Sequence, residues 1–298
     1  MDSFKLKTDL YKYITKTKNI LSADFKEYLF KDPILLYYSD FSKNWGDYIN
    51  PFLVEKISGK KTVSYKRIYN IKNKKKLTGV GSILHHPGLA DAVIWGSGFI
   101  HPVDSLKELP SEILVLRGKH SAKIFQDNGI KDKGVYGDPA LLFPTFYKPT
   151  SAKKFKIGFL PHYSELNSFL TNKNITENKD VTVISPMVPH NKVYKIIDQI
   201  DECEIIVSSS LHGLILADVY QIPSLRFTFT NKIYGGDFKY DDYYSGVGIN
   251  QHHTVHFDSL DSIDYKLLYW NASLKDLKFS AEAIKQPLKE YISRNYKI

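Results

Sequence analysis

The amino-acid sequence predicts an α/β protein made of two units that face each other across a cleft. Short apolar stretches of strand length alternate with helical stretches in both halves of the chain, which is typical of parallel sheets. The polar stretch 149–154 has no periodicity and separates the two halves. A length of 298 residues allows two domains of ordinary size. We therefore expect one domain over residues 1–149 and a second over residues 150–298.

In the first half, each expected strand leads into a polar or glycine-rich loop. Strands are expected at 33–38, 77–81, 92–95 and 113–116, and helices at 48–57 and 121–128. Residues 1–31 are expected to form one or two amphipathic helices, because Leu6, Leu10 and Ile14 share a helical face. We expect that face to pack on the core, while the surrounding lysines also allow peripheral contact with an anionic inner membrane.

The second half repeats this pattern. Strands are expected at 156–160, 181–184, 204–207 and 224–228, and helices at 191–200 and 211–220. Residues Tyr234–Tyr244 are expected to form an aromatic loop in which Asp237, Asp241 and Asp242 are solvated. Beyond Ser273, apolar residues recur at helical spacing, which predicts a final helix that straps back across the first domain and ends or kinks near Pro287.

Composition and charge exclude several classes of protein. Apolar residues make up 43% of the chain, which allows a full core, but no apolar stretch reaches the ~18 residues of a membrane span. The segment Met1–Leu10 lacks a signal-peptide core, so we expect a cytoplasmic protein. The net charge of +9 suits an anionic substrate. No zinc spacing, helix-turn-helix signal or RNA-binding aromatic motif points to nucleic acid.

The chain carries no recognisable metal or cofactor motif. Its single cysteine, Cys203, allows neither an intramolecular disulfide nor a cysteine-based metal site. The pairs His85–His86 and His252–His253 are adjacent, and adjacent side chains do not share a face of a helix or strand. The glycines after the first strands form neither a dinucleotide fingerprint nor a phosphate loop. We therefore expect no metal and no cofactor.

The most informative stretch is residues 207–217, Val-Ser-Ser-Ser-Leu-His-Gly-Leu-Ile-Leu-Ala. An apolar strand leads through three serines into a buried helix, whose first backbone N–H groups lack helical partners and carry the positive end of the helix dipole. Three hydroxyls and the imidazole of His212 lie over these groups, an arrangement suited to a phosphate or carboxylate. The alternative is structural: Ser209 or Ser210 only caps the helix, and His212 is a core histidine.

Four further polar residues follow expected strands or open helices. Arg117 has the planar fork of donors that binds a carboxylate or phosphate. His162, like His212, is of the side-chain type that exchanges protons near neutral pH, so either histidine suits general acid or base catalysis. Asp47 suits hydrogen bonds to sugar hydroxyls or the role of a base, with helix capping as the alternative. Asp138 precedes a proline, which favours a structural turn.

Taken together, these loops resemble the polysaccharide pyruvyltransferase family. The resemblance rests on six ordered motifs over residues 34–230. They are Asn44-x-Gly46-Asp47, Trp95-Gly96-Ser97-Gly98, Arg117-Gly118 with Ser121, Gly137-Asp138-Pro139-Ala140-Leu141-Leu142, Gly158-x-x-Pro161-His162-Tyr163, and Ser208-Ser209-Ser210-Leu211-His212-Gly213-Leu214-Ile215-x-Ala217. The pattern is most similar to the branch that includes bacterial exopolysaccharide ketal-pyruvate transferases.

The resemblance implies both a fold and a reaction. The fold would be two Rossmann-like domains arranged as in type B glycosyltransferases (GT-B), with the acceptor on the first domain and the donor on the second. The donor would be phosphoenolpyruvate, a co-substrate and not a bound cofactor. The product would be a pyruvate ketal on two hydroxyls of a sugar in capsule, exopolysaccharide or lipopolysaccharide assembly. The sequence leaves open the acceptor, which could be nucleotide-linked, lipid-linked or polymeric, and the oligomeric state.

The resemblance also implies roles for single residues. His212 would protonate the methylene carbon of the donor, and His162 is the second candidate acid or base. Asp47 would orient or deprotonate the acceptor hydroxyl. The remaining donor-binding candidates are Arg117, Ser208, Ser209, Ser210 and Gly213, and the remaining acceptor-binding candidates are Asn44, Gly96 and Ser97.

One departure from the family pattern concerns Ser210. Many members carry arginine at this position, two residues before the histidine. If that arginine helps to bind the donor in those relatives, another cation must replace it here; the alternative is an altered use of the donor. Arg117 and His162 are the first candidates, and Arg226 and Lys232 are weaker ones. Two alternative functions remain: a glycosyltransferase of the same fold that uses a sugar nucleotide, and a non-catalytic protein that binds glycans or anions. No acidic motif for a nucleotide ribose is evident in the second half.

Overall fold

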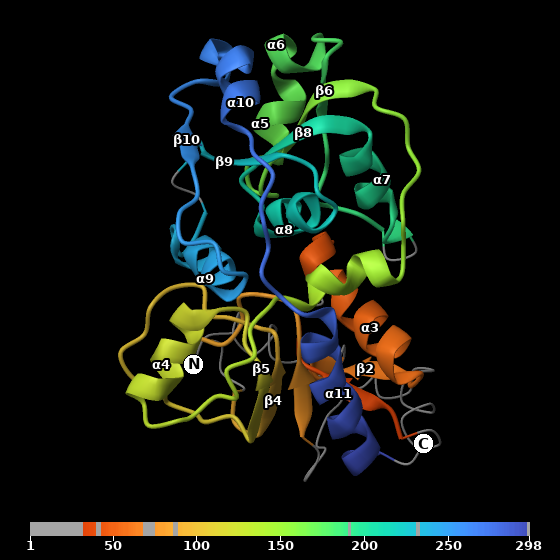
Figure 1. The fold of residues 1–298 in the computed structure, drawn as a ribbon, viewed down its shortest axis with the longest axis vertical. Coiled ribbons are helices and arrows are strands. Elements are labelled where there is room, and N and C mark those ends of the chain that lie inside the picture. Colours follow the sequence, from red (N-terminus) through yellow and green to blue (C-terminus); the bar gives the residue numbers. More distant parts are fainter. Residues whose placement is uncertain are drawn as a thin grey trace, which may run out of the picture.

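Two five-stranded parallel sheets organise the computed structural model, which describes residues 32–39, 43–67, 75–85, 89–189, 192–230 and 233–296 (Figure 1). The first sheet contains β1 (Ile34–Leu36), β2 (Thr62–Ser64), β3 (Lys76–Thr78), β4 (Ala92–Trp95) and β5 (Glu112–Val115). The second contains β6 (Phe155–Leu160), β7 (Val181–Val183), β8 (Cys203–Ser208), β9 (Ser224–Thr228) and β10 (Thr254–His256). All pairings within both sheets are parallel, which confirms the predicted α/β class.

The two sheets have the same strand order. The first is β2-β1-β3-β4-β5 and the second is β10-β9-β8-β6-β7, so in each unit the second strand along the chain lies at one edge, beside the first strand. This is a doubly wound order, consistent with two Rossmann-like units. The winding reverses between β1 and β3, and again between β6 and β8. Ligands of open α/β sheets bind beyond the carboxyl ends of strands at such reversal points.

Sequence patterning locates eight of these strands and misses β2 and β10. Both missed strands lie at a sheet edge and are three residues long. An edge strand has a neighbour on one side only, so it needs fewer apolar side chains than a central strand. All three residues of β10 are partly or fully exposed, so its hydrophobic signal is weak.

Helices and 3-10 turns connect the strands. The α-helices are α3 (Trp45–Ser58), α4 (Lys119–Asp127), α5 (Leu166–Thr171), α6 (Lys173–Thr176), α7 (Lys195–Asp201), α8 (Leu211–Val219), α9 (Phe238–Gly246), α10 (Tyr265–Asn271) and α11 (Ala281–Asn295). The 3-10 turns are η1 (Tyr65–Arg67), η2 (Pro139–Thr145) and η4 (Leu260–Ser262). Helix α8 has an almost wholly buried sequence, as expected for a helix that is apolar on most sides.

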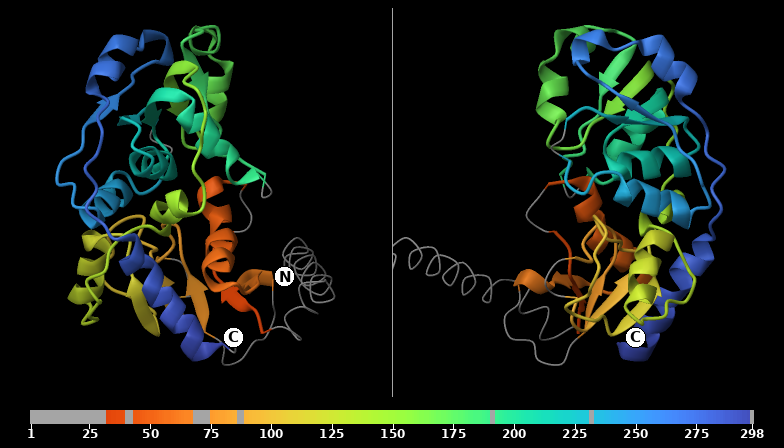
Figure 2. Two further views of the ribbon diagram at one scale, coloured as in Figure 1. Left: turned by 45° about the vertical axis from the view of Figure 1, so that its right-hand side comes forward. Right: turned by 90° about the vertical axis from the view of Figure 1, so that its left-hand side faces the viewer.

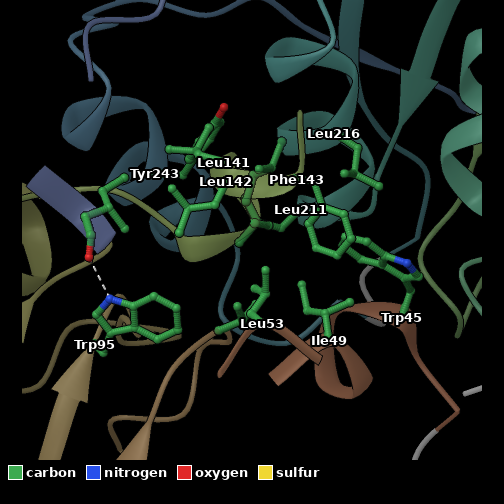
Figure 3. Close-up of a cluster of buried hydrophobic side chains, with 14 of the residues drawn as sticks. Trp45, Ile49, Leu53, Trp95, Leu141, Leu142, Phe143, Leu211, Leu216 and Tyr243 are labelled. Atoms are coloured by element: carbon green, nitrogen blue, oxygen red, sulfur yellow. Dashed lines mark hydrogen bonds between the residues drawn. The ribbon is translucent and has the colours of Figure 1, made fainter. Parts of the chain in front are cut away.

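One hydrophobic core joins the two units. It includes Trp45 and Ile49 of α3, Phe143 of η2, and Leu211 and Leu216 of α8 (Figure 3). The aromatic rings of Trp45 and Phe143 lie 4.9 Å apart. The indole Nε1 of Trp45 also donates a hydrogen bond across the interface, to the carbonyl oxygen of Val193 at 2.8 Å. The amino-terminal end of α3 is therefore built into the second unit.

The final helix packs on the first unit. The chain descends from the second unit and ends in α11, beside α3 and β5 (Figures 1 and 2). Trp95 Nε1 donates to the carbonyl oxygen of Ile284 at 2.8 Å (Figure 3). Pro287 lies inside α11, which continues to Asn295, so the expected end at this proline is wrong. Burial of Leu288 and its helical neighbours against the first unit offsets the lost backbone hydrogen bond.

The segment expected to be an aromatic loop contains a helix. Residues 238–246 form α9, with Tyr240, Tyr243 and Tyr244 buried. These three tyrosines and Val247 share one helical face, which packs on the core shared by the two units. Asp242 has no exposed surface, so the expectation that it is solvated is wrong. Most residues of 234–244 are tyrosine, aspartate or glycine, which are weak helix formers, and this hid the helical period.

The expected amphipathic helices of residues 1–31 lie outside the described residues. Within the residues that are described, none of the helices has the length and apolar character needed to cross a bilayer.

We predict that α11 is part of the cooperative core. Leu288→Ala should lower the free energy of unfolding by about 2–5 kcal/mol, because Leu288 has no exposed surface and its truncation leaves a cavity. The measurement is equilibrium unfolding in urea, with the exposed Lys289→Ala as the matched control. Equal stability of the two variants would mean that α11 is not packed as described.

Candidate functional site

His212 lies in the first turn of α8, at the interface between the two units. Its ring centroid is 6.2 Å from that of Trp45, and its side chain is 13% exposed. Gly46 lies directly against the imidazole, since a Cβ at this position would be 2.1 Å from His212 Nδ1. The first sequence motif therefore needs glycine here, because any larger residue would displace the ring.

Asp138 faces His212 from the first unit. One carboxylate oxygen, Oδ1, accepts from Ala140 N at 2.9 Å and forms the turn that the sequence predicts. The other oxygen, Oδ2, lies 3.7 Å from His212 Nε2. Both of these atoms are buried, and neither has a hydrogen-bond partner in the described part of the chain. Buried polar atoms are rarely left unpaired, so a small shift that joins the two would be favourable.

The hydroxyls of the serine loop (Ser208–Ser210) differ in the hydrogen bonds that they make. Ser208 Oγ donates to the carbonyl oxygen of Leu160 at 2.7 Å and accepts from Ser210 N at 3.0 Å. Gly213 lets α8 pack closely here, because a Cβ on it would be 2.5 Å from Ser208 Oγ. Ser210 occupies the N-cap position, but its side chain makes no capping bond. The Ser210 hydroxyl and the first amides of α8 are thus the donors left for a ligand.

Ser209 connects His162 to a buried carboxylate. Its hydroxyl donates to Glu165 Oε2 at 2.6 Å and accepts from His162 N at 2.9 Å. Burial, and secondly the charge of Lys239, lower the pKa of His162 to about 4. The imidazole is therefore neutral at pH 7. This contradicts the expectation that His162 supplies the cation missing at Ser210.

Arg117 is part of a buried ion pair and not of an open anion site. Its side chain has no exposed surface, and its Nε and Nη2 lie 2.9 and 2.8 Å from Asp242 Oδ2. The other hydrogen bonds go to Ser82 Oγ and the carbonyl oxygen of Phe99, both at 2.5 Å. Asp242 also accepts from the backbone and hydroxyl of Ser121, each at 2.7 Å. With its donors taken up by the fold, Arg117 does not fit the predicted donor-binding role.

Two glycine motifs of the first unit leave the space that this ion pair and the backbone of α9 occupy. A Cβ at Gly98 would be 2.5 Å from the Arg117 guanidinium, and one at Gly118 would be 1.6 Å from the Asp242 carbonyl oxygen. The motifs Gly-Ser-Gly and Arg-Gly therefore specify a close approach of α9 to the first sheet.

Two other buried cations lie near the serine loop. Arg226 is 4% exposed, pairs with Asp237 and lies over the ring of Tyr240 at 3.9 Å. Lys239 is 6% exposed and has no carboxylate within ion-pair distance among the described residues. Burial and then the charges of Arg117 and Arg226 lower its pKa to about 8. Sequence patterns did not single out Lys239, although a lone lysine in a tyrosine-rich segment is a usable signal. Lys232 lies outside the described residues.

The acceptor-side candidates separate into two groups. Asn44 and Asp47 are partly exposed at the start of α3, next to Gly46, with Asn44 Nδ2 donating to Asp47 Oδ2 at 3.3 Å. Ser97 is fully buried, donates to the carbonyl oxygen of Gly79 and lies 3.2 Å from Thr78 Oγ1. Its predicted contact with the acceptor is therefore wrong, because the hydroxyl is enclosed by the sheet.

Gly96 also has a structural reason to be glycine. Its φ of 92° lies in the left-handed region, and a Cβ on it would be 2.2 Å from Pro139 Cδ. This contact positions the turn that carries Asp138, so Gly96 acts on the site through that turn.

A separate pocket of about 700 Å³ lies on the other side of α9. Asp237, Asp241, Tyr244 and Ser245 line it from one helical face, roughly opposite the face of Lys239. Its lining includes neither His212 nor the serine loop. This pocket therefore does not coincide with the pair of His212 and Asp138.

Comparison with known proteins gives three results. A family model described as polysaccharide pyruvyl transferase matches residues 11–231. An uncharacterized protein of Acanthamoeba polyphaga mimivirus is 29% identical over 224 residues, which cover 73% of this chain and 76% of that protein. The succinoglycan biosynthesis protein ExoV of Rhizobium meliloti (strain 1021) is 26% identical over 180 residues, which cover 58% of this chain and 54% of ExoV. The matched range includes His212 and Asp138 but ends before α9.

We predict that Asp242→Asn destabilises the protein by about 3–5 kcal/mol, because it leaves the Arg117 guanidinium buried without its counter-charge. The measurement is urea unfolding. Asp241→Asn is the matched control, since that carboxylate is 44% exposed. A loss below about 1 kcal/mol for Asp242→Asn would contradict the role of the ion pair.

We also predict that His162 takes up its proton near pH 4 in the folded protein, as measured by NMR titration of the imidazole. Lys239→Met should raise this pKa, because a nearby positive charge disfavours the imidazolium. Since the unfolded chain binds this proton already near pH 6.5, stability from His162 is present above pH 6.5 and is lost as the pH falls towards 4. An unchanged midpoint in Lys239→Met would show that the two groups are not neighbours.

Proposed function

The chain belongs to the polysaccharide pyruvyl transferase family, and on that premise we propose that it transfers pyruvate from phosphoenolpyruvate to a sugar. The product is a cyclic pyruvate ketal on two sugar hydroxyls, made during assembly of a surface polysaccharide. The relationship to a succinoglycan biosynthesis protein supports the polysaccharide context. We further propose that the two doubly wound units have the GT-B arrangement, with the donor on the second unit.

The pairing of His212 with Asp138 is the main support for this reaction. Their ring nitrogen and carboxylate oxygen are both buried and unpaired, 3.7 Å apart, at the point where the second sheet reverses its winding. A carboxylate in this position orients the imidazole and stabilises its protonated form. With Nε2 turned towards Asp138, Nδ1 is the nitrogen left to exchange a proton with substrate.

The proposed reaction begins with proton transfer from His212 to the methylene carbon of phosphoenolpyruvate. The double bond is consumed, a methyl group forms and positive character develops at the carbon that bears the phosphate. One sugar hydroxyl adds to this carbon, and its proton restores His212. The second hydroxyl then attacks the same carbon and breaks the bond to the phosphate oxygen. Inorganic phosphate leaves with the second proton, so atoms and charges balance.

The other site residues support this scheme through binding. The Ser210 hydroxyl and the amides that open α8 are available to an anionic donor, with the helix dipole behind them. Asp47, one residue beyond the glycine that contacts His212, is the proposed acceptor-side group that orients or deprotonates a hydroxyl. Ser208, Ser209 and Gly213 hold the loop in shape.

The test is turnover of phosphoenolpyruvate with a panel of sugar acceptors in D₂O. We expect release of phosphate and a ketal whose methyl group carries one deuterium per turnover, detected by mass spectrometry. His212→Ala should abolish turnover while unfolding within about 1 kcal/mol of the parent. Phosphate release by His212→Ala at the parental rate would overturn the assignment.

A matched variant tests whether the charge of Asp138 supports His212 in the reaction. Asp138→Asn keeps the size of the side chain but removes its charge, so it should lower kcat by about 10²-fold with a small change in KM. A parental kcat in this variant would show that Asp138 does no more than form its turn.

A further inference from the structure

The acids near the serine loop do not balance all of the positive charges there. Arg117 pairs with Asp242, and Arg226 pairs with Asp237. Lys239 alone of these three buried cations has no carboxylate within ion-pair distance among the described residues.

The buried acid that attracts Lys239 is Glu165, and its carboxylate oxygens accept hydrogen bonds from other residues. The carboxylate of Glu165 accepts from Ser209 Oγ at 2.6 Å through Oε2. Its other oxygen accepts from the hydroxyl and amide of Thr230, at 2.7 and 3.0 Å. These bonds hold Glu165 in place beneath the loop and do not include Lys239, whose ammonium lies over the ring of Tyr240, 5.1 Å from its centroid.

Two connections bring Lys239 to the serine loop. The next residue, Tyr240, donates its hydroxyl to the carbonyl oxygen of Ser209 at 2.6 Å, which ties the start of α9 to the loop. His162 donates its backbone N–H to the hydroxyl of the same serine, and its imidazole is near enough to Lys239 to feel the charge. Lys239 and the amino-terminal end of α8 are therefore neighbours.

A buried ammonium with no counter-ion, close to two guanidinium groups, is unfavourable in the unliganded protein. An entering dianion would remove this penalty and would also meet the free amides of α8. An unpaired buried cation next to such a helix end is thus the expected form of an empty anion site.

We propose that Lys239 binds the phosphate group of the donor, together with Ser210 and the first amides of α8. The proposal rests on the proposed function for the identity of the donor. The lysine comes from α9, beyond the range matched by the family model, and supplies from another element the charge that is absent at Ser210.

The first test measures binding and does not depend on turnover. Inorganic phosphate and pyruvate, which each carry one anionic group of the donor, are titrated by calorimetry into the parent, Lys239→Met and Lys239→Arg. We expect Lys239→Met to weaken phosphate binding by about 10-fold or more and to leave pyruvate binding unchanged. Lys239→Arg should retain phosphate binding, because it keeps the charge. Lys173→Met, on the surface of α6, is the matched control.

Parental phosphate binding by Lys239→Met would overturn the inference, as would a larger loss of pyruvate binding than of phosphate binding. Lys239→Met is expected to fold, because it removes a buried unpaired charge. If it does not, loss of phosphate binding in Lys239→Gln with retention in Lys239→Arg provides the same evidence, and equal binding by both overturns it.

Kinetics separate this inference from the proposed function. If the parent turns over phosphoenolpyruvate, Lys239→Met should raise KM for the donor far more than it lowers kcat. If the parent has no turnover but phosphate binding still depends on Lys239, the anion site stands and the proposed function fails. Turnover by the parent with an unchanged KM in Lys239→Met overturns the inference alone.

Discussion

The buried ion pair of Arg117 and Asp242 joins the two units and determines how they meet. The arginine follows β5 of the first sheet, the aspartate lies on α9 of the second unit, and neither has exposed surface. Such a pair is stable only if every remaining donor and acceptor is satisfied, and the fold supplies Ser82, Phe99 and Ser121 for this purpose. Since α9 also carries Lys239, the same contact places a cation beside the serine loop.

The surroundings of His212 exist only because the units are packed together. His212 belongs to the second unit, whereas Gly46 and Asp138, which surround its ring, belong to the first. The two facing polar atoms of the pair are buried and have no hydrogen-bond partner among the described residues, a cost that a ligand or a small closure would remove. Loss of the interface would therefore separate His212 from Asp138 and Gly46 without damage to any of the three residues.

Both sheets share one strand order, but the candidate site residues His162, His212 and the serine loop lie at the reversal point of the second. There the carboxyl ends of β6 and β8 bring His162 and the serine loop together, and Ser208 lies opposite both Leu160 and Arg226 in register. The ends of β4 and β5 in the first unit carry Ser97 and Arg117, which are enclosed by the fold. The loops after corresponding strands of the two sheets thus differ in role, because those of the first sheet are covered by the second unit.

The sequence by itself determined the α/β class, eight of the ten strands described, the serine loop before α8 and the candidacy of His212. These follow from local periodicity and from residue types at strand ends, which act over a few neighbours along the chain. Only the tertiary structure decided that Arg117 pairs internally, that Asp138 faces His212 and that Lys239 is a buried cation with no ion pair among the described residues. Arg117 and Asp242 are 125 positions apart, and no local pattern records which distant charge a buried guanidinium meets. The role of a side chain depends on its burial and on the residues it contacts, and both are determined by the packed interface.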